Sequence, residues 1–160
     1  MDNIKFYQVS PCYVDYLLPY APHLFHNKQK RQQNERKYIG VVLHIHNMDY
    51  FAPLSSFKEK HKLMAESLDF IKIKNYAVIN LNNMFPVPDG QFSYVDISKE
   101  RNPKYKSLLL AEYRYVKSIQ EKIRKNAAIL YRLKVNGNIS PLTKRCNDFE
   151  LLENLCKKYR

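Results

Sequence analysis

The sequence predicts an α+β fold in which about six short strands form a mainly antiparallel sheet and a long helix follows toward the C-terminus. Two observations support this fold class. Between residues 4 and 97, runs of β-branched, aromatic and apolar residues alternate with short turns, and turns this short join antiparallel strands. Beyond residue 102, the apolar residues recur at helical spacing instead. A chain of 160 residues is expected to form a single domain, residues 1–160.

The expected strands lie in a regular series along the first part of the chain. They cover residues 4–9, 38–45, 50–58, 69–73, 76–81 and 92–97. The second and third strands are expected to form a hairpin, because residues 47–49 mark a turn between them. Pro53 indicates an edge strand or a bulge, since proline cannot donate to a ladder hydrogen bond. Residues 84–88 are expected to lead into a turn at Asp89-Gly90.

Three helices are expected besides a short one at residues 13–18. Residues 58–65 and 148–159 are predicted as helices, and the last presents leucines for docking. The longest begins at Asn102-Pro103, where a capping side chain precedes a proline, and stops at Gly137, with a break near Asn126 left open. Its apolar and basic residues occupy nearly opposite arcs of the helical wheel.

The positive charge of the chain is concentrated in two segments. The formal net charge is +12. Residues 28–37 carry five Lys or Arg against one Glu, and residues 101–134 carry ten against two, which accounts for the whole excess. This concentration favours a polyanionic partner, with nucleic acid preferred over a solvated face and over an acidic protein or lipid surface.

The cysteines and the hydropathy restrict the setting. Cys12, Cys146 and Cys156 have no zinc-type spacing, so reduced thiols in a cytoplasmic protein are expected, with no cofactor and no metal. No apolar run approaches the roughly 20 residues that a membrane span requires. The first residues also lack the apolar core of a secretory signal.

The segment Ser55-Ser56-Phe57-Lys58, at the end of the hairpin, is the strongest candidate for chemistry. Two hydroxyls and an ammonium group in a positive field suit a phosphodiester, because they can orient a phosphate and stabilise its charge. The alternative is a helix N-cap in which one of the serines opens the helix that follows. The two interpretations are compatible, since helix N-termini also bind phosphate.

Several segments, in this order, resemble one protein family. They are Phe6-Tyr7, residues 38–43, residues 52–58 with the Ser-Ser-x-Lys pattern, the strand Ile79-Asn80-Leu81, the long helix, and residues 146–152. Over nearly the whole chain, this series is similar to the ToxN/AbiQ family, the toxins of type III toxin–antitoxin systems and phage-abortive-infection proteins.

The resemblance implies a fold and a function together. The fold is a highly twisted antiparallel sheet with flanking helices, related to Kid/MazF toxins. The function is metal-independent, sequence-selective cleavage of cellular or phage RNA to 2′,3′-cyclic phosphate and 5′-hydroxyl ends. The toxin is inhibited by a small repetitive pseudoknot RNA that it processes itself, in closed assemblies that are commonly three-plus-three. The alternatives are a non-catalytic basic RNA-binding protein and a DNA-associated or acidic-protein-binding module.

The resemblance also implies the catalytic residues. Carried over to this chain, the family's hydroxyl-hydroxyl-x-lysine segment is Ser55, Ser56 and Lys58, with Lys58 as the proton carrier. A second family lysine corresponds here to Arg36, with Lys37 beside it. Arginine stays protonated, so Arg36 is expected to stabilise phosphate charge, and either Lys37 takes the lysine's role or Lys58 acts alone.

Basic residues of three segments are expected to bind RNA: the basic loop, the helix after the serines, and the basic arc of the long helix. The default for the histidine among them is an ordinary surface residue, and the default for the arc is a solvated face. The candidates are Lys28, Lys30, Arg31, Lys60, His61, Lys62, Lys106, Arg114, Lys117, Arg124 and Lys125.

Overall fold

The computed structural model describes residues 2–24 and 36–159, and its centre is a seven-stranded antiparallel sheet. The strand order is β4-β5-β3-β2-β1-β7, with β6 paired to β3 outside this path. The α+β class and the antiparallel sheet are confirmed. The strands are β1 (Lys5–Val9), β2 (Lys37–Ile45), β3 (Met48–Ser56), β4 (Phe70–Ile73), β5 (Ala77–Asn80), β6 (Phe85–Val87) and β7 (Phe92–Tyr94).

The predicted hairpin is confirmed as β2 and β3. His46 and Asn47 connect the two strands at φ values of 52° and 60°, which is the left-handed geometry of the tightest hairpin turns. The register runs from Ile45 opposite Met48 to Lys37 opposite Leu54, and it shifts at a bulge after Gly40. A Cβ atom at Gly40 would lie 2.4 Å from the buried Phe51 ring, so the bulge requires glycine for close approach.

The expected edge strand at Pro53 is wrong, because β3 is an inner strand, and the bulge of the hairpin lies after Gly40 of β2 and not at Pro53. One edge of β3 pairs with β2, while its other edge pairs with β6 at residues 49–51 and with β5 at residues 54–56. Pro53 lies between these two paired segments, at a point where neither β6 nor β5 faces it. Strand β6 is an addition to the predicted strands, since residues 84–88 were expected only to lead into the turn at Asp89-Gly90. Among the described strands β6 pairs only with β3, and such an edge strand tolerates Pro86.

The long helix is divided in two at Ile119, not near Asn126, so this expected position is wrong. Ile119 leaves helical geometry at φ −116° and ψ 14°. The Asn102 cap is confirmed, because its side chain accepts hydrogen bonds from the backbone N–H groups of Lys104 and Tyr105. The helices are α1 (Pro11–Leu17), α2 (Glu59–Leu63), α3 (Pro103–Ser118), α4 (Gln120–Val135), α5 (Pro141–Lys144) and α6 (Phe149–Lys158), with 3₁₀ turns η1 (Leu18–Tyr20), η2 (Leu81–Asn83) and η3 (Ile97–Lys99).

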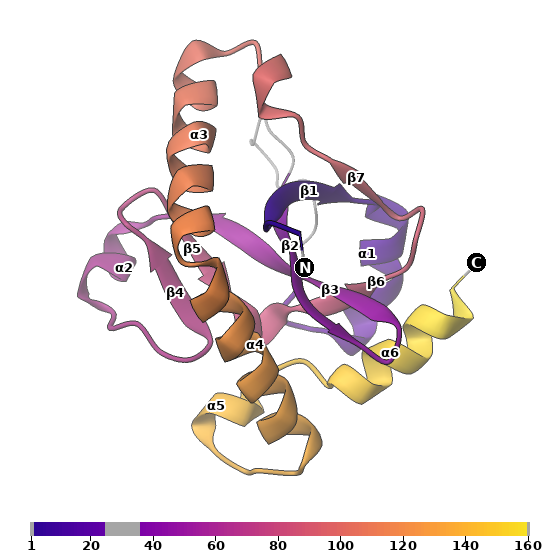
Figure 1. The fold of residues 1–160 in the computed structure, drawn as a ribbon. Coiled ribbons are helices and arrows are strands. Elements are labelled where there is room, and N and C mark those ends of the chain that lie inside the picture. Colours follow the sequence, from indigo (N-terminus) through magenta and orange to yellow (C-terminus); the bar gives the residue numbers. More distant parts are fainter. Residues whose placement is uncertain (1, 25–35, 160) are drawn as a thin grey trace.

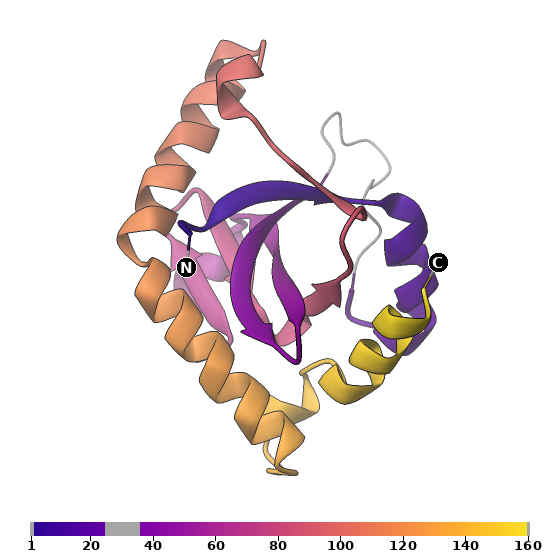
Figure 2. The same ribbon diagram turned by 45° about the vertical axis from the view of Figure 1, so that its right-hand side comes forward.

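Helices cover both sides of the twisted sheet. In Figures 1 and 2, α3 and α4 run end to end as a bent rod along one side, and α1 and α6 lie on the other. The bend at Ile119 lets both halves of the rod follow the curvature of the sheet, with Val116 and Ile123 buried on either side of it. No helix in residues 2–24 or 36–159 is long and apolar enough to cross a membrane.

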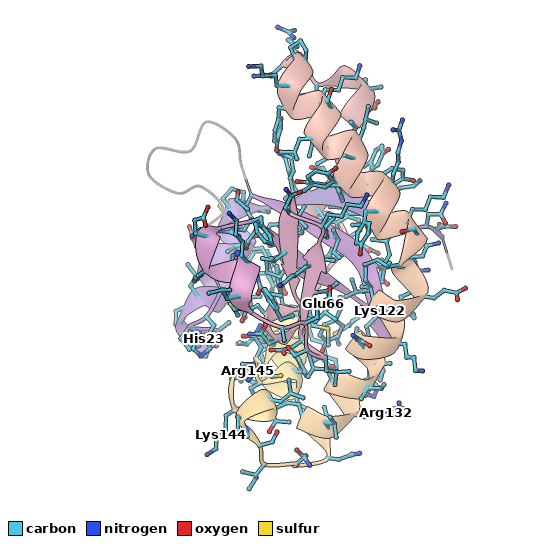
Figure 3. All side chains as sticks on the ribbon, turned by 90° about the vertical axis from the view of Figure 1, so that its left-hand side faces the viewer. His23, Glu66, Lys122, Arg132, Lys144 and Arg145 are labelled. Carbon is cyan, nitrogen blue, oxygen red and sulfur yellow. The ribbon has the colours of Figure 1, made fainter. Side chains whose placement is uncertain are left out.

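An ion pair ties the bent rod to the far edge of the sheet. Glu66, between α2 and β4, accepts a hydrogen bond of 2.9 Å from the backbone N–H of Lys72 and pairs with Lys122 of α4 at 2.9 Å. Figure 3 shows these two labelled side chains, Glu66 and Lys122, near each other in front of the sheet. The contact closes the sheet edge against the helical layer that also forms one wall of the site.

Candidate functional site

A cleft of about 610 Å³ lies where the C-terminal end of β3 meets the start of β2, helix α2, the end of β5 and helix α3. Five residues that the sequence suggested for catalysis line this one cleft. They are Arg36 and Lys37 at the start of β2, Ser55 and Ser56 at the end of β3, and Lys58 before α2. The antiparallel pairing of β2 with β3 explains the arrangement, because it places the start of one strand beside the end of the other.

Ser55 is held by two donors. Its Oγ accepts a hydrogen bond of 3.1 Å from Arg36 Nη1 and one of 3.4 Å from Asn80 Nδ2. A hydroxyl that accepts from two groups still has its own proton to donate. Ser55 is half-buried and Ser56 is exposed, so the two hydroxyls differ in their access to a ligand.

The side chains of Arg36 and Lys37 contact different parts of the cleft lining. Burial of the Arg36 guanidinium lowers its pKa from the ordinary value, yet an arginine remains a cation. The Lys37 ammonium lies 5.9 Å from the centre of the Tyr105 ring on α3. The arginine therefore holds a hydroxyl of β3, while the lysine reaches across to the helical wall.

The serine N-cap is wrong as an account of this segment. Both serines belong to β3, where Ser55 pairs with Val78 and Ser56 with Ala77, and the residue at the N-cap of α2 is Lys58. Because the ladder fixes the backbone of the serines, their side chains are presented from a strand end, not from a helix end.

His61 is buried, so the default of a surface histidine is wrong. Its exposed fraction is 6%, and its Nδ1 accepts a hydrogen bond of 2.8 Å from the backbone N–H of Lys58. Burial lowers the pKa of His61, and Lys60, Lys58 and Lys72 lower it further. A neutral ring that accepts at Nδ1 carries its proton on Nε2, and the side chain lines the cleft.

The residues predicted to bind RNA are distributed more widely. Lys60 lines the cleft, whereas Lys62 pairs with Glu59 at 3.0 Å. Three candidates fall outside the described residues, namely Lys28, Lys30 and Arg31.

Some basic side chains of α3 and α4 are exposed to solvent, and others donate hydrogen bonds within the protein. Arg114, Lys117 and Lys125 are exposed. Lys106 donates a hydrogen bond of 3.3 Å to the carbonyl of Ser98. Arg124 donates to the backbone carbonyls of Val41 and Asp2, so its guanidinium also fastens the N-terminal segment to α4.

Arg145 is a cleft residue that the sequence did not indicate. Its Nε and Nη2 donate to the carboxylate of Asp69 at 2.6 and 2.9 Å, and Ser67 Oγ donates to the same carboxylate at 2.8 Å. Burial acts to raise the pKa of Asp69, but the hydrogen bonds from Arg145 and Ser67 outweigh it and hold the pKa below its usual range. Arg145 lies between α5 and α6 (Figure 3), far from Asp69 in sequence, and no local pattern points to the pair.

Helix α3 contributes a second set of unpredicted cleft residues, Tyr105, Leu108, Leu109 and Glu112. Glu112 had a detectable signal, since an acidic residue stands between Leu109 and Val116 within the apolar arc of the helix. With this wall the cleft combines hydroxyls, fixed cations, an aromatic ring and a carboxyl group. Hydroxyls and cations around one space are the groups that bind a phosphate.

Comparison with known proteins identifies the family. Residues 5–157 match the family model described as toxin ToxN of type III toxin–antitoxin systems. The endoribonuclease ToxN of Bacillus thuringiensis subsp. kurstaki is 32% identical, covering 99% of this chain and 86% of that protein. The endoribonuclease ToxN of Pectobacterium atrosepticum is 31% identical, covering 98% of this chain and 92% of that protein.

Solved structures agree with the sequence comparisons. One solved structure comes from work on a processed non-coding RNA that regulates a bacterial antiviral system. It matches with a TM-score of 0.87 at 28% identity, covering 97% of this chain and 98% of that one. A second comes from work on selective toxin inhibition by a non-coding RNA pseudoknot. It matches with a TM-score of 0.84 at 30% identity, covering 99% of this chain and 98% of that one. AbiQ, a lactococcal anti-phage endoribonuclease, has a TM-score of 0.82 at 28% identity, with 99% and 98% covered. The chain therefore belongs to the ToxN family of toxins from type III toxin–antitoxin systems.

Proposed function

We propose that this protein is a metal-independent, sequence-selective endoribonuclease. The observation that carries the proposal is the convergence of Arg36, Ser55, Ser56 and Lys58 in one cleft, in a chain whose relatives are named endoribonucleases. Cleavage without a metal needs a proton acceptor for the 2′-hydroxyl, a proton donor for the leaving oxygen and fixed charge at the phosphorus. The cleft holds candidates for each of these tasks.

The proposed reaction is an internal transesterification. The 2′-oxygen of RNA attacks the adjacent phosphorus and its proton passes to the enzyme, while the bond between phosphorus and the 5′-oxygen breaks and that oxygen takes up a proton. The products are a 2′,3′-cyclic phosphate and a 5′-hydroxyl. Lys58 carries the proton transfer, Ser56 orients the phosphate, and Arg36 stabilises the developing charge while holding Ser55 in place.

Two single substitutions test this assignment. Ser56→Ala and Lys58→Ala are expected to abolish cleavage of a cellular RNA by the purified protein while RNA binding is largely kept. Lys157→Ala is the matched control, because Lys157 is an exposed lysine on α6, which covers the other side of the sheet (Figure 2). Wild-type protein that binds RNA yet leaves it intact, with and without EDTA, would make this a non-catalytic RNA-binding protein instead.

We also propose that a small repetitive RNA with a pseudoknot fold inhibits the toxin and is processed by it. Support comes from the solved relatives, whose descriptions concern a processed non-coding RNA and inhibition by an RNA pseudoknot. Exposed cations on α3 and α4 offer this RNA a surface outside the cleft. We propose closed toxin–RNA assemblies, such as three of each, which a mass measurement in solution tests. The setting is phage defence by abortive infection, in the cytoplasm where the RNA substrates are.

A further inference from the structure

Glu112 is a buried carboxyl group at the wall of the cleft. It lies on the apolar face of α3, between Leu109 and Val116, and its exposed fraction is 5%. Its side chain nevertheless lines the same cleft as Ser55 and Lys58. The residue therefore combines an interior position with access to whatever occupies the cleft.

The carboxyl group of Glu112 has no donor within the described part of the chain. Across residues 2–24 and 36–159, no hydrogen bond or ion pair reaches it, and burial alone raises the pKa of Glu112 to about 7. Its oxygens are not among the buried, unpartnered polar atoms of the described chain, so they are open to the cleft. An acceptor that opens into a cleft from an apolar wall is expected to bind a donor group of the ligand.

The same wall carries an aromatic ring. Tyr105 lies seven residues before Glu112, which is about two turns of α3 and therefore the same face of the helix. Its ring is half-buried and lines the cleft together with Leu108. Unpaired bases of RNA stack on exposed aromatic rings and present their polar edges to side chains beside them.

The cleft thus has a phosphate-binding side and an apolar, aromatic side, which correspond to the phosphate and the base of a nucleotide. Strands β2 and β3 and the start of α2 supply the cations and hydroxyls that suit a phosphate, while α3 supplies apolar and aromatic surface with one carboxyl group. Among the described residues, no lysine or arginine of the cleft forms an ion pair with Glu112, and burial is the cause of its raised pKa.

We propose that the α3 wall receives the nucleobase next to the scissile phosphate, with Tyr105 as the stacking surface and Glu112 as the acceptor for an exocyclic amino group of that base. A carboxyl oxygen accepts a hydrogen bond from the amino groups of adenine, guanine or cytosine, and uracil has no such group. Glu112 then selects against uracil at one position beside the cleavage site. The inference rests on the proposed ribonuclease function and deepens it.

Cleavage of four matched oligoribonucleotides tests the proposal. They differ only in the base at one position flanking the mapped cleavage site, and each flanking position is tested in turn. The wild type is expected to disfavour uracil at one of them. Glu112→Leu, which removes the acceptor, is expected to reduce this discrimination by roughly tenfold, the effect of one good side-chain contact to a base. Glu112→Gln keeps an acceptor oxygen and is expected to retain most of the preference.

Glu121→Gln is the control, because Glu121 is an exposed glutamate on α4, outside the cleft. If Glu112→Leu cleaves with the wild-type base preference, the proposal for Glu112 is wrong while the ribonuclease function stands. If the wild type cleaves none of the oligonucleotides and no cellular RNA, the proposed function fails and this inference falls with it. Thermal unfolding of each variant separates loss of preference from loss of folding.

Discussion

Replacing Glu112 by glutamine is expected to make the stability of the protein less dependent on pH. The folded state raises the pKa of Glu112 from 4.5 to about 7 through burial, so the native chain keeps a proton that the unfolded chain releases. Below the unfolded pKa of 4.5, both states hold the proton and the glutamate costs nothing through ionisation. The free energy of unfolding therefore has its full value below pH 4.5, and it is progressively reduced as the pH rises through the folded pKa of about 7.

The size of the loss follows from the shift itself. One pKa unit corresponds to about 1.4 kcal/mol, so a rise from 4.5 to about 7 corresponds to about 3 kcal/mol of unfolding free energy. Most of this loss falls between about pH 5 and about pH 8. At the melting temperature of a domain of this length, about 3 kcal/mol corresponds to a difference on the order of 8 °C.

Urea unfolding of the wild type and of Glu112→Gln, at about pH 5 and about pH 8, measures the effect. Every other titrating group is common to both proteins, so the difference between their pH dependences isolates Glu112. Between about pH 5 and about pH 8, the free energy of unfolding of Glu112→Gln is expected to rise relative to that of the wild type by about 2 to 3 kcal/mol. If the gap between the two proteins is the same at both pH values, Glu112 does not ionise within a buried site and the reasoning is wrong.

Two further predictions concern the sheet and the RNA surface. Gly40→Ala is expected to destabilise the fold by about 1–3 kcal/mol, because the new methyl group overlaps the buried Phe51 ring, and chemical unfolding measures it; wild-type stability in this variant would show that the ring can move aside. Arg114→Ala or Lys117→Ala is expected to weaken binding of a small structured RNA and to reduce the slope of log affinity against log salt by about 0.7 to 0.9. A slope unchanged from that of Lys157→Ala would show that Arg114 and Lys117 lie on a solvated face and do not contact the RNA.

Local patterns were enough to predict the part of the fold that carries the site. The hairpin follows from two apolar runs around a short turn, and the Asn102 cap follows from the residue types at the start of α3. Because β2 and β3 are antiparallel neighbours, Arg36 and Ser55 meet even though they are 19 residues apart. The clustering of the expected catalytic residues is therefore a consequence of a feature that sequence can specify.

Long-range contacts were beyond the reach of sequence patterns. The Asp69–Arg145 pair joins residues 76 apart, and nothing near either one marks the other. The break at Ile119 occurs with no glycine or proline beside it, so no helix-breaking residue marks its position in the sequence. Likewise, Pro53 suggested an edge strand or a bulge. The pairing of one edge of β3 with both β5 and β6 is a property of the tertiary structure, and the residues around Pro53 do not reveal it.

The position of the serines at the end of β3 has a consequence for how the protein tolerates change. Strand β3 pairs on both edges, and its last residues are in register with β5 while its first are in register with β6. Ser55 and Ser56 themselves pair with Val78 and Ala77 of β5, so opening of the β3–β5 ladder moves their backbone. Substitutions in β5 that loosen this ladder are therefore expected to shift the two hydroxyls. If the proposed catalytic role of the serines holds, a weaker toxin can arise through a less stable sheet without any change in the cleft.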